Sequence, residues 1–333
     1  MKFLLIFSHL FIFIAQSFSK EELNLYSARQ EVLMRPLIKL FEDEYKINVN
    51  IVSAKANQLI NRIVQEGEYT NADILLTTDV GRLHIAKEKN IFQKIDSITL
   101  TNLIPGNYRD NDNYWFGISL RARLLVYNKN SINKSDLNGY MDLANDKWKS
   151  KILVRSSSNV YNQSLISAMV IKYGEEEVKK FLKGFISNFA RKPSGGDRDQ
   201  IRAVAAGEGD LALVNSYYFL KMKSQDNQKK LGHVIEYFPK DNFMQTHINI
   251  SGAGIIKNSK NKENAIKFLE FLVSNEAQKI YAEVNFEYPI RKNIELNRFM
   301  KKYNNFVKDD INLSDLAKLN KKSIMLMDIA GWQ

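Results

Sequence analysis

The chain has 333 residues, with 48 lysines and arginines against 37 aspartates and glutamates, so its formal net charge is +11. It contains no cysteine, which excludes disulfide bonds, thiolate metal sites and a lipid anchor on cysteine. The length suggests two lobes, and the positive balance fits nucleic acid, an anionic surface or an anionic ligand.

The first nineteen residues have the pattern of a secretory signal peptide. Lys2 precedes an apolar core from Phe3 to Ala15, and the small residues Ser17 and Ser19 follow it. We predict a signal peptide over 1–19 with cleavage after Ser19. No later stretch approaches the roughly 20 apolar residues that a membrane-spanning helix needs. We therefore expect an exported, soluble protein that is not an integral membrane protein, and export argues against a nucleic-acid partner.

Short apolar strands alternate with amphipathic helices along the chain, in two sets. This alternation is typical of a parallel sheet covered by helices on both faces. Two long β-rich runs lie between and after the sets, at 114–130 and 247–258. The expected strands are 22–28, 48–54 and 72–79 in the first set and 151–158 and 209–216 in the second; the expected helices are 32–45, 57–67, 80–90, 161–174, 175–187, 217–224 and 263–284.

This order predicts an α/β protein of two lobes, each a mainly parallel sheet flanked by helices. Two crossover strands would join the lobes and leave a cleft between them. We place the N-terminal lobe at 20–118 with 250–290, and the C-terminal lobe at 119–249 with 291–333. In open α/β sheets, ligands bind at the carboxyl ends of the strands.

Three tyrosines follow strands of the second set, at the starts of helices. Tyr217 and Tyr218 come directly after Asn215 and Ser216, which have the character of a helix N-cap. Adjacent side chains diverge on a strand and in mid-helix, so a junction is where two neighbouring phenols can converge. Tyr161 stands in the first turn of another helix, after three serines and the capping residue Asn159.

The tyrosines suggest a site for a hard cation. Helix N-termini favour anions, and a bound cation of high charge would ionise phenols whose ordinary pKa is near 10. Three phenolates suit Fe(III) better than zinc or Cu(I). The four histidines are not paired at a ligand spacing, and His247 is interpreted as a hydrogen-bonding residue on a crossover strand. Asp197 and Asp199 are interpreted as helix-capping residues.

Several stretches together resemble the periplasmic ferric-iron-binding proteins of ABC transporters. They are "NLYSARQ", "ADILLTTDVGRL", "WFGISLRARLLVYNK", "VRSSSNVYNQSL", "RKPSGGDRDQIRAVAAGEGDLALVNSYY" and "HINISGAGI" with "YPI". They occur in order and span nearly the whole chain. The resemblance implies a periplasmic binding protein with no enzymatic activity, which delivers its iron to an inner-membrane ABC permease. We expect it to act as a monomer.

The resemblance also implies roles for individual residues. Tyr161, Tyr217 and Tyr218 would bind Fe(III), and an exogenous carbonate would complete the coordination. Arg121 matches the residue that holds this anion in the three-tyrosine branch of the family.

In much of the family a histidine or tyrosine follows the arginine that corresponds to Arg29. Here Gln30 and Glu31 follow it, so the first lobe lacks the usual ligand. Arg29 and Gln30 are further candidates to contact the anion, and Glu31 is a weaker candidate for a direct ligand.

Two alternative functions remain open at this stage. A small oxyanion could occupy the same cleft, and it fits the loops better than a polyamine because these offer mainly Tyr, Ser and Arg. A secreted hydrolase could use one of Ser156, Ser157 and Ser158 with His247. A serine run before a helix is, however, explained more simply as a cap.

Overall fold

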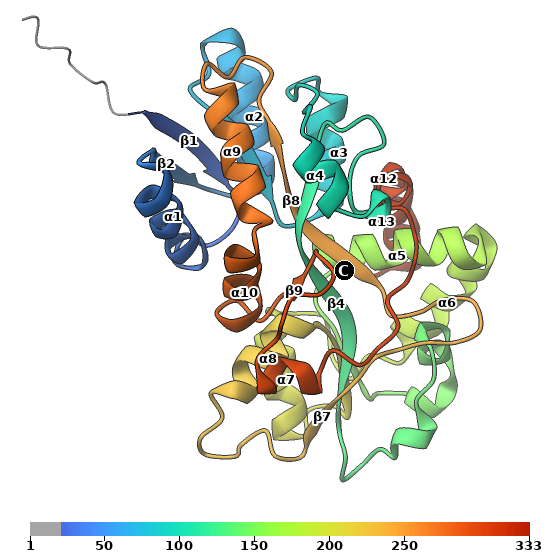
Figure 1. Ribbon diagram of the computed structural model, residues 1–333. Helices are drawn as coiled ribbons and strands as arrows, with labels where there is room; N and C mark the ends of the chain where they lie inside the picture. Colours follow the sequence, from blue (N-terminus) through green and yellow to red (C-terminus); the bar gives the residue numbers. More distant parts are fainter. Residues whose placement is uncertain (1–20) are drawn as a thin grey trace, which may run out of the picture.

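The computed structural model describes residues 21–333, so the predicted signal peptide lies outside the described residues. The first part of the chain alternates strands and helices: β1 (Glu22–Ser27), α1 (Glu31–Tyr45), β2 (Asn48–Ser53), α2 (Ala56–Glu66), β3 (Ile74–Thr77), α3 (Val80–Glu88) and α4 (Ile98–Leu103). β1 pairs in parallel with β2 on one side and β3 on the other. Figure 1 shows these elements together in the upper half of the molecule.

Two long strands connect the halves of the molecule. β4 (Phe116–Asn128) and β8 (Ile248–Ile255) run antiparallel to each other, and β8 also pairs with β3. The first half of β4 pairs with β8, and its second half pairs with two strands of the lower half of the molecule. β4 therefore belongs to both halves and fixes how their sheets meet.

The second half repeats the strand and helix alternation. It contains β5 (Ile152–Leu153), α5 (Val160–Tyr173), α6 (Glu175–Ser187), α7 (Asp197–Ala206), β6 (Leu211–Asn215), α8 (Ser216–Ser224) and β7 (Val234–Tyr237). β5 and β6 are parallel, whereas β6 and β7 are antiparallel to β4. Within each half, the strands that alternate with helices are thus parallel to one another, whereas the crossover strands β4 and β8 are antiparallel to the strands they pair with.

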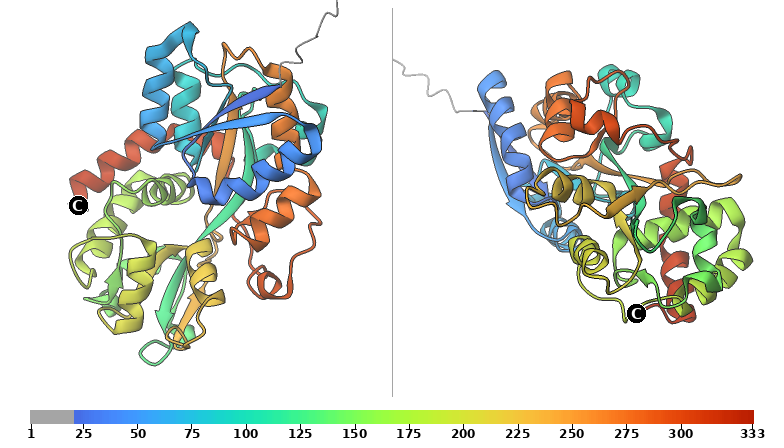
Figure 2. Two further views of the ribbon diagram at one scale, coloured as in Figure 1. Left: turned by 90° about the vertical axis from the view of Figure 1, so that its left-hand side faces the viewer. Right: turned by 90° about the horizontal axis from the view of Figure 1, so that it is seen from below.

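The C-terminal elements return to both halves. They are α9 (Lys262–Leu272), α10 (Asn275–Glu283), β9 (Tyr288–Pro289), α11 (Arg298–Lys302), α12 (Leu313–Lys318) and α13 (Asn320–Ala330). α9 and α10 pack on α1, α12 contacts both α3 and α5, and α13 lies against α5 and α6. Figure 2 shows α13 beside the green helices of the second half. Short 3₁₀ helices lie in connections at Gly67–Tyr69, Gly106–Tyr108, Lys134–Asp136, Tyr140–Ala144 and Asp146–Trp148.

Most of the elements follow the sequence prediction, and the largest difference lies before α5. A strand was expected over 151–158, but β5 ends at Leu153. The polar residues after it form the turn that leads into α5, where Asn159 Oδ1 accepts a hydrogen bond from Tyr161 N at 3.2 Å. The predicted Asn159 cap is thus confirmed. Among residues 21–333, no helix is long and apolar enough to cross a membrane.

Candidate functional site

A cavity of about 170 Å³ lies where the two halves of the molecule face each other. Six of the seven residues that the sequence offered as ligands or anion contacts line it, and Glu31, the weaker ligand candidate, does not. The complete lining is Ala28, Arg29, Gln30, Leu33, Thr78, Arg121, Tyr161, Arg198, Tyr217, Tyr218 and Glu287. The structure therefore brings together side chains from β4 and from the starts of α1, α5, α7 and α8.

The three tyrosines reach the cavity from two helix starts. Tyr217 and Tyr218 are the second and third residues of α8, which follows β6 without a loop, and Tyr161 is the second residue of α5. The hydroxyl oxygens of Tyr161 and Tyr217 are 3.4 Å apart, and the rings of Tyr217 and Tyr218 have centroids 4.0 Å apart. The phenols thus converge, as the strand-to-helix junction predicts.

The surroundings keep Tyr217 and Tyr218 neutral without a cation. Burial raises the pKa of Tyr217 well above its usual value, and the neighbouring Tyr161 and Tyr218 raise it further. Burial, followed by Tyr161, also raises the pKa of Tyr218. Only a strongly charged group near the oxygens of Tyr217 and Tyr218 would ionise both at neutral pH.

Arg121 approaches the tyrosines from β4. Its guanidinium carbon lies 5.5 Å from the ring centroid of Tyr161 and 5.8 Å from that of Tyr217. Its Nη1 donates to the carbonyl oxygen of Thr78 at 2.7 Å and lies 3.4 Å from Tyr161 Oη, and its Nη2 donates to Ser251 Oγ. Arg121 is almost fully buried, so its charge acts directly on the phenols.

Arg29 also lines the cavity, but its guanidinium forms an ion pair with a carboxylate. Its Nη1 and Nη2 donate to the two carboxylate oxygens of Glu287 at 3.0 and 2.7 Å, and Nη1 also donates to Ser251 Oγ at 2.6 Å. Burial alone would raise the pKa of Glu287, yet Arg29 and Arg121 lower it, so the carboxylate is charged. Arg29 and Glu287 therefore cancel each other's charge.

The two residues after Arg29 have different positions. Gln30 lines the cavity with an exposed side chain. Glu31 does not line it, because its carboxylate pairs with Arg35 one turn along α1, where Nε donates at 2.7 Å. The structure therefore gives no support to Glu31 as a ligand.

Arg198 and Glu287 are cavity residues that the sequence did not reveal. The guanidinium carbon of Arg198 lies 5.2 Å from the ring centroid of Tyr218. Arg198 stands in a stretch that carries the family resemblance and Glu287 directly precedes another, but nothing in the sequence showed that their side chains turn toward the tyrosines.

The interpretation of Asp197 as a helix-capping residue, made from the sequence, is wrong. Asp199 does have that role, since Gly196 N donates to its Oδ2 at 2.7 Å. Asp197 is fully buried instead and accepts hydrogen bonds from Arg123 Nη1 at 2.8 Å, Arg155 Nη1 at 2.6 Å and Asn215 N at 2.8 Å. This carboxylate ties together β4, the turn before Tyr161 and the strand end before Tyr217.

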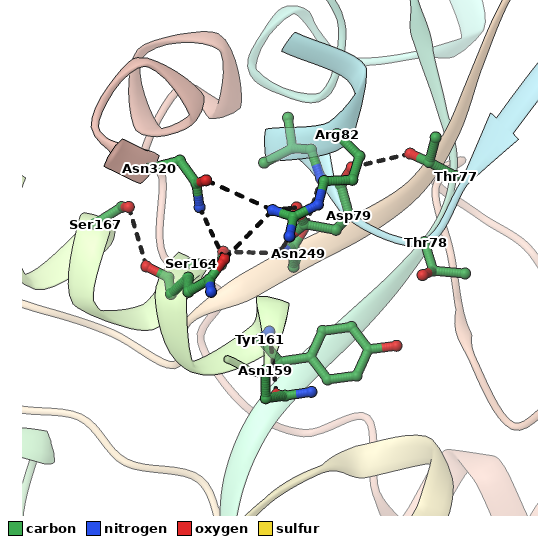
Figure 3. A network of polar contacts seen from close by, with 12 residues as sticks. Thr77, Thr78, Asp79, Arg82, Asn159, Tyr161, Ser164, Ser167, Asn249 and Asn320 are labelled. Carbon is green, nitrogen blue, oxygen red and sulfur yellow. Dashed lines mark hydrogen bonds and ion pairs between the residues drawn. The ribbon is translucent and has the colours of Figure 1, made fainter. Parts of the chain in front are cut away.

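A polar network continues from the cavity along the boundary between the halves (Figure 3). Asn249 of β8 donates to Asp79 Oδ2 and to Ser164 Oγ, both at 2.7 Å. Arg82 of α3 reaches Gln163 of α5 at 3.3 Å and Asn320 of α13 at 3.5 Å. The network links α3 of the first half to α5, the helix that carries Tyr161.

The residues considered for a hydrolase are not assembled. His247 is buried and its Nε2 lies 2.9 Å from Ser164 Oγ, not from the serine run, which confirms the hydrogen-bonding role predicted for it. Burial lowers the pKa of His247 to about 3, with a smaller contribution from Arg123. Ser156 Oγ bonds to Ser158 Oγ at 3.0 Å. Within residues 21–333, no group of three or more His, Asp and Glu side chains could hold a metal ion.

Comparison with known proteins decides the family. A model described as "Bacterial extracellular solute-binding protein" matches residues 70–311. The chain belongs to this family of bacterial extracellular solute-binding proteins. It is therefore a solute-binding protein and not an enzyme, as the sequence predicted.

Relatives of this solute-binding protein have names that refer to iron. "Iron uptake protein A1" of Synechocystis is 41% identical over 317 residues, which cover 94% of this chain and 88% of that protein. A Trichodesmium protein (IdiA, FutA), solved in complex with iron and citrate ligands, is 46% identical with a TM-score of 0.89, covering 94% of this chain and all of that one.

A ferric binding protein from Campylobacter jejuni is 39% identical with a TM-score of 0.88, covering 93% of this chain and all of that one. The close agreement of these folds confirms the predicted two-lobed α/β class. The residue boundaries of the lobes stay a prediction.

Proposed function

We propose that this solute-binding protein captures Fe(III) in the periplasm and delivers it to an ABC permease of the inner membrane. Tyr161, Tyr217 and Tyr218 are the proposed ligands, and the protein acts as a monomer. The observation that carries the proposal is the convergence of three phenols, two of them with hydroxyl oxygens 3.4 Å apart, in one cavity between the halves of the molecule. The ferric and iron-uptake names of the relatives support it.

Three phenolates leave part of the coordination sphere of Fe(III) free, and we propose that a carbonate fills it. Arg121 is the first candidate to hold this anion because it is buried, charged and within 6 Å of two of the phenol rings. Arg29 is a poorer anion contact than the sequence suggested, because Glu287 already binds two of its nitrogens. Gln30 stays a candidate at the cavity wall.

Tyr217 and Tyr218 are neutral before iron arrives, so each of them releases a proton when it binds the metal. What this chain supplies is a set of three phenols that line one cavity of about 170 Å³. Arg121 and the helix starts of α5 and α8 place positive charge near the oxygens, which favours the phenolate form.

A visible absorption titration of the iron-free protein with a chelated ferric salt tests the proposal. We expect a broad phenolate-to-iron charge-transfer band that saturates at one iron per chain and strengthens when bicarbonate is added. If no band forms at any bicarbonate concentration, the tyrosines are not ligands. The arginine-lined cavity would then favour the alternative function, binding of a small oxyanion.

A further inference from the structure

We infer that Arg198 is a second residue that binds the carbonate, and that it acts with Arg121 from the other side of the cavity. This inference rests on the proposed function, because it concerns the anion that accompanies the iron.

The first step is the state of the three arginines that line the cavity. Arg29 makes a bidentate ion pair with Glu287, and Arg121 donates to Thr78 O and Ser251 Oγ. The side chain of Arg198 makes no hydrogen bond and no ion pair with any of the residues 21–333, and it lies over the face of the Tyr218 ring. Its guanidinium therefore has donors available for a ligand.

The second step is the balance of charge in the occupied cavity. Three phenolates would neutralise Fe(III), and Glu287 neutralises Arg29. Among the side chains that line the cavity, Arg121 and Arg198 then remain as two positive charges without counterparts, which match the two negative charges of carbonate. Arg121 is buried, so its charge is costly without a counterpart, whereas Arg198 is partly exposed and can reach an anion from the solvent side.

The third step is placement. Arg121 comes from β4 and lies near Tyr161 and Tyr217, whereas Arg198 comes from the first turn of α7 and lies near Tyr218. The two guanidinium groups thus flank the three phenols from different elements. The adjacent Asp197 is anchored to Arg123 and Arg155, which fixes the start of α7 and the backbone position of Arg198.

The test compares Arg198→Gln with Arg202→Gln on the same helix. Arg202 is an exposed residue one turn further along α7 that pairs with Asp199 at 2.9 Å and does not line the cavity. Each variant is titrated with bicarbonate at a fixed concentration of ferric nitrilotriacetate, and the charge-transfer band is recorded.

In Arg198→Gln we expect the half-saturating bicarbonate concentration to rise about tenfold, which corresponds to about 1.4 kcal/mol. The band should reach its normal amplitude at saturating bicarbonate, because the tyrosines are unchanged. Arg202→Gln should match the unmodified protein. Arg198→Lys keeps the charge over the Tyr218 ring but loses the planar donor pair, so its half-saturating bicarbonate concentration should lie between those of Arg198→Gln and Arg202→Gln.

Equal bicarbonate dependence in Arg198→Gln and Arg202→Gln would overturn the inference. A band that forms fully without bicarbonate in the unmodified protein would overturn it as well, while leaving the tyrosine ligands in place. A missing band in the unmodified protein would instead refute the proposed function, and the carbonate role of Arg198 with it. Since Arg198 has no structural partner other than the ring, we expect both of its variants to fold normally.

Discussion

Replacing Asp197 with asparagine tests whether its buried carboxylate stabilises the segments that carry the three tyrosines. The carboxylate of Asp197 accepts hydrogen bonds from Arg123, Arg155 and the backbone N of Asn215. In the variant, the amide can keep one or two of these contacts, but its negative charge is lost. Arg123 is as deeply buried as Asp197, so its positive charge would be left without a counter-ion.

The expected size of the effect follows from this burial. Removing one partner of a buried ion pair costs about 3–5 kcal/mol because the remaining charge stays away from water. We therefore expect the free energy of unfolding of Asp197→Asn to fall by about that amount. Urea denaturation followed by circular dichroism measures it.

A surface pair provides the matched control. Asp315 pairs with Lys318 at 2.8 Å, and both side chains are more than half exposed. Exposed pairs contribute little, so Asp315→Asn should leave the urea midpoint unchanged. If Asp197→Asn is no less stable than Asp315→Asn, the buried carboxylate does not hold the segments together and the reasoning is wrong. If it is less stable as expected, iron binding by the folded variant should also be weaker, because Asn215 directly precedes Ser216 and Tyr217.

Three further predictions concern the cavity and its surroundings. Tyr217→Phe and Tyr218→Phe keep the ring but remove an oxygen ligand, so each should lower iron affinity by more than about 100-fold. Competition with a chelator measures the affinity, and unchanged affinity in both variants would contradict the ligand assignment. Glu287→Gln leaves Arg29 without its counter-charge, so bicarbonate should saturate the iron complex at a several-fold lower concentration, at some cost in stability; a higher concentration would contradict the charge balance. The pKa of His247 is about 3 in the folded protein and about 6.5 in the unfolded chain, so between these pH values only the unfolded chain binds the proton. The free energy of unfolding therefore falls as pH falls from about 6.5 toward 3, by up to about 1.4 kcal/mol per pH unit. Urea unfolding at pH 7.5 and 5 should therefore show a smaller pH effect in His247→Gln, and an equal effect would show that this histidine is not responsible.

Local patterns in the sequence were enough to find the tyrosines. The predicted cap at Asn159 and the strand end at Asn215 place Tyr161 and Tyr217 at helix starts, and both depend only on neighbouring residues. The ion pair between Arg29 and Glu287 joins positions 258 residues apart, and the sequence carries no local signal for such a contact.

The same limit explains the error at Asp197. An aspartate at the start of a helix is most simply interpreted as a cap, and Asp199 two residues later fits that description. What distinguishes Asp197 is that Arg123 and Arg155 converge on it, and those residues belong to segments 74 and 42 positions away. Local composition indicates which residues can cap a helix, but only the assembled sheet determines which of them become buried counter-ions.

The network in Figure 3 has a consequence for how the protein would release its cargo. Asn249, with both of its contacts at 2.7 Å, lies on a crossover strand, where a rotation of the lobes produces little displacement. The contacts of Arg82 to Gln163 and Asn320, at 3.3 and 3.5 Å, are at the long limit of a hydrogen bond, so separating them costs little. At these two contacts the lobes can therefore part at little enthalpic cost, and bonds to the metal and its anion would hold the loaded protein closed more firmly than they do.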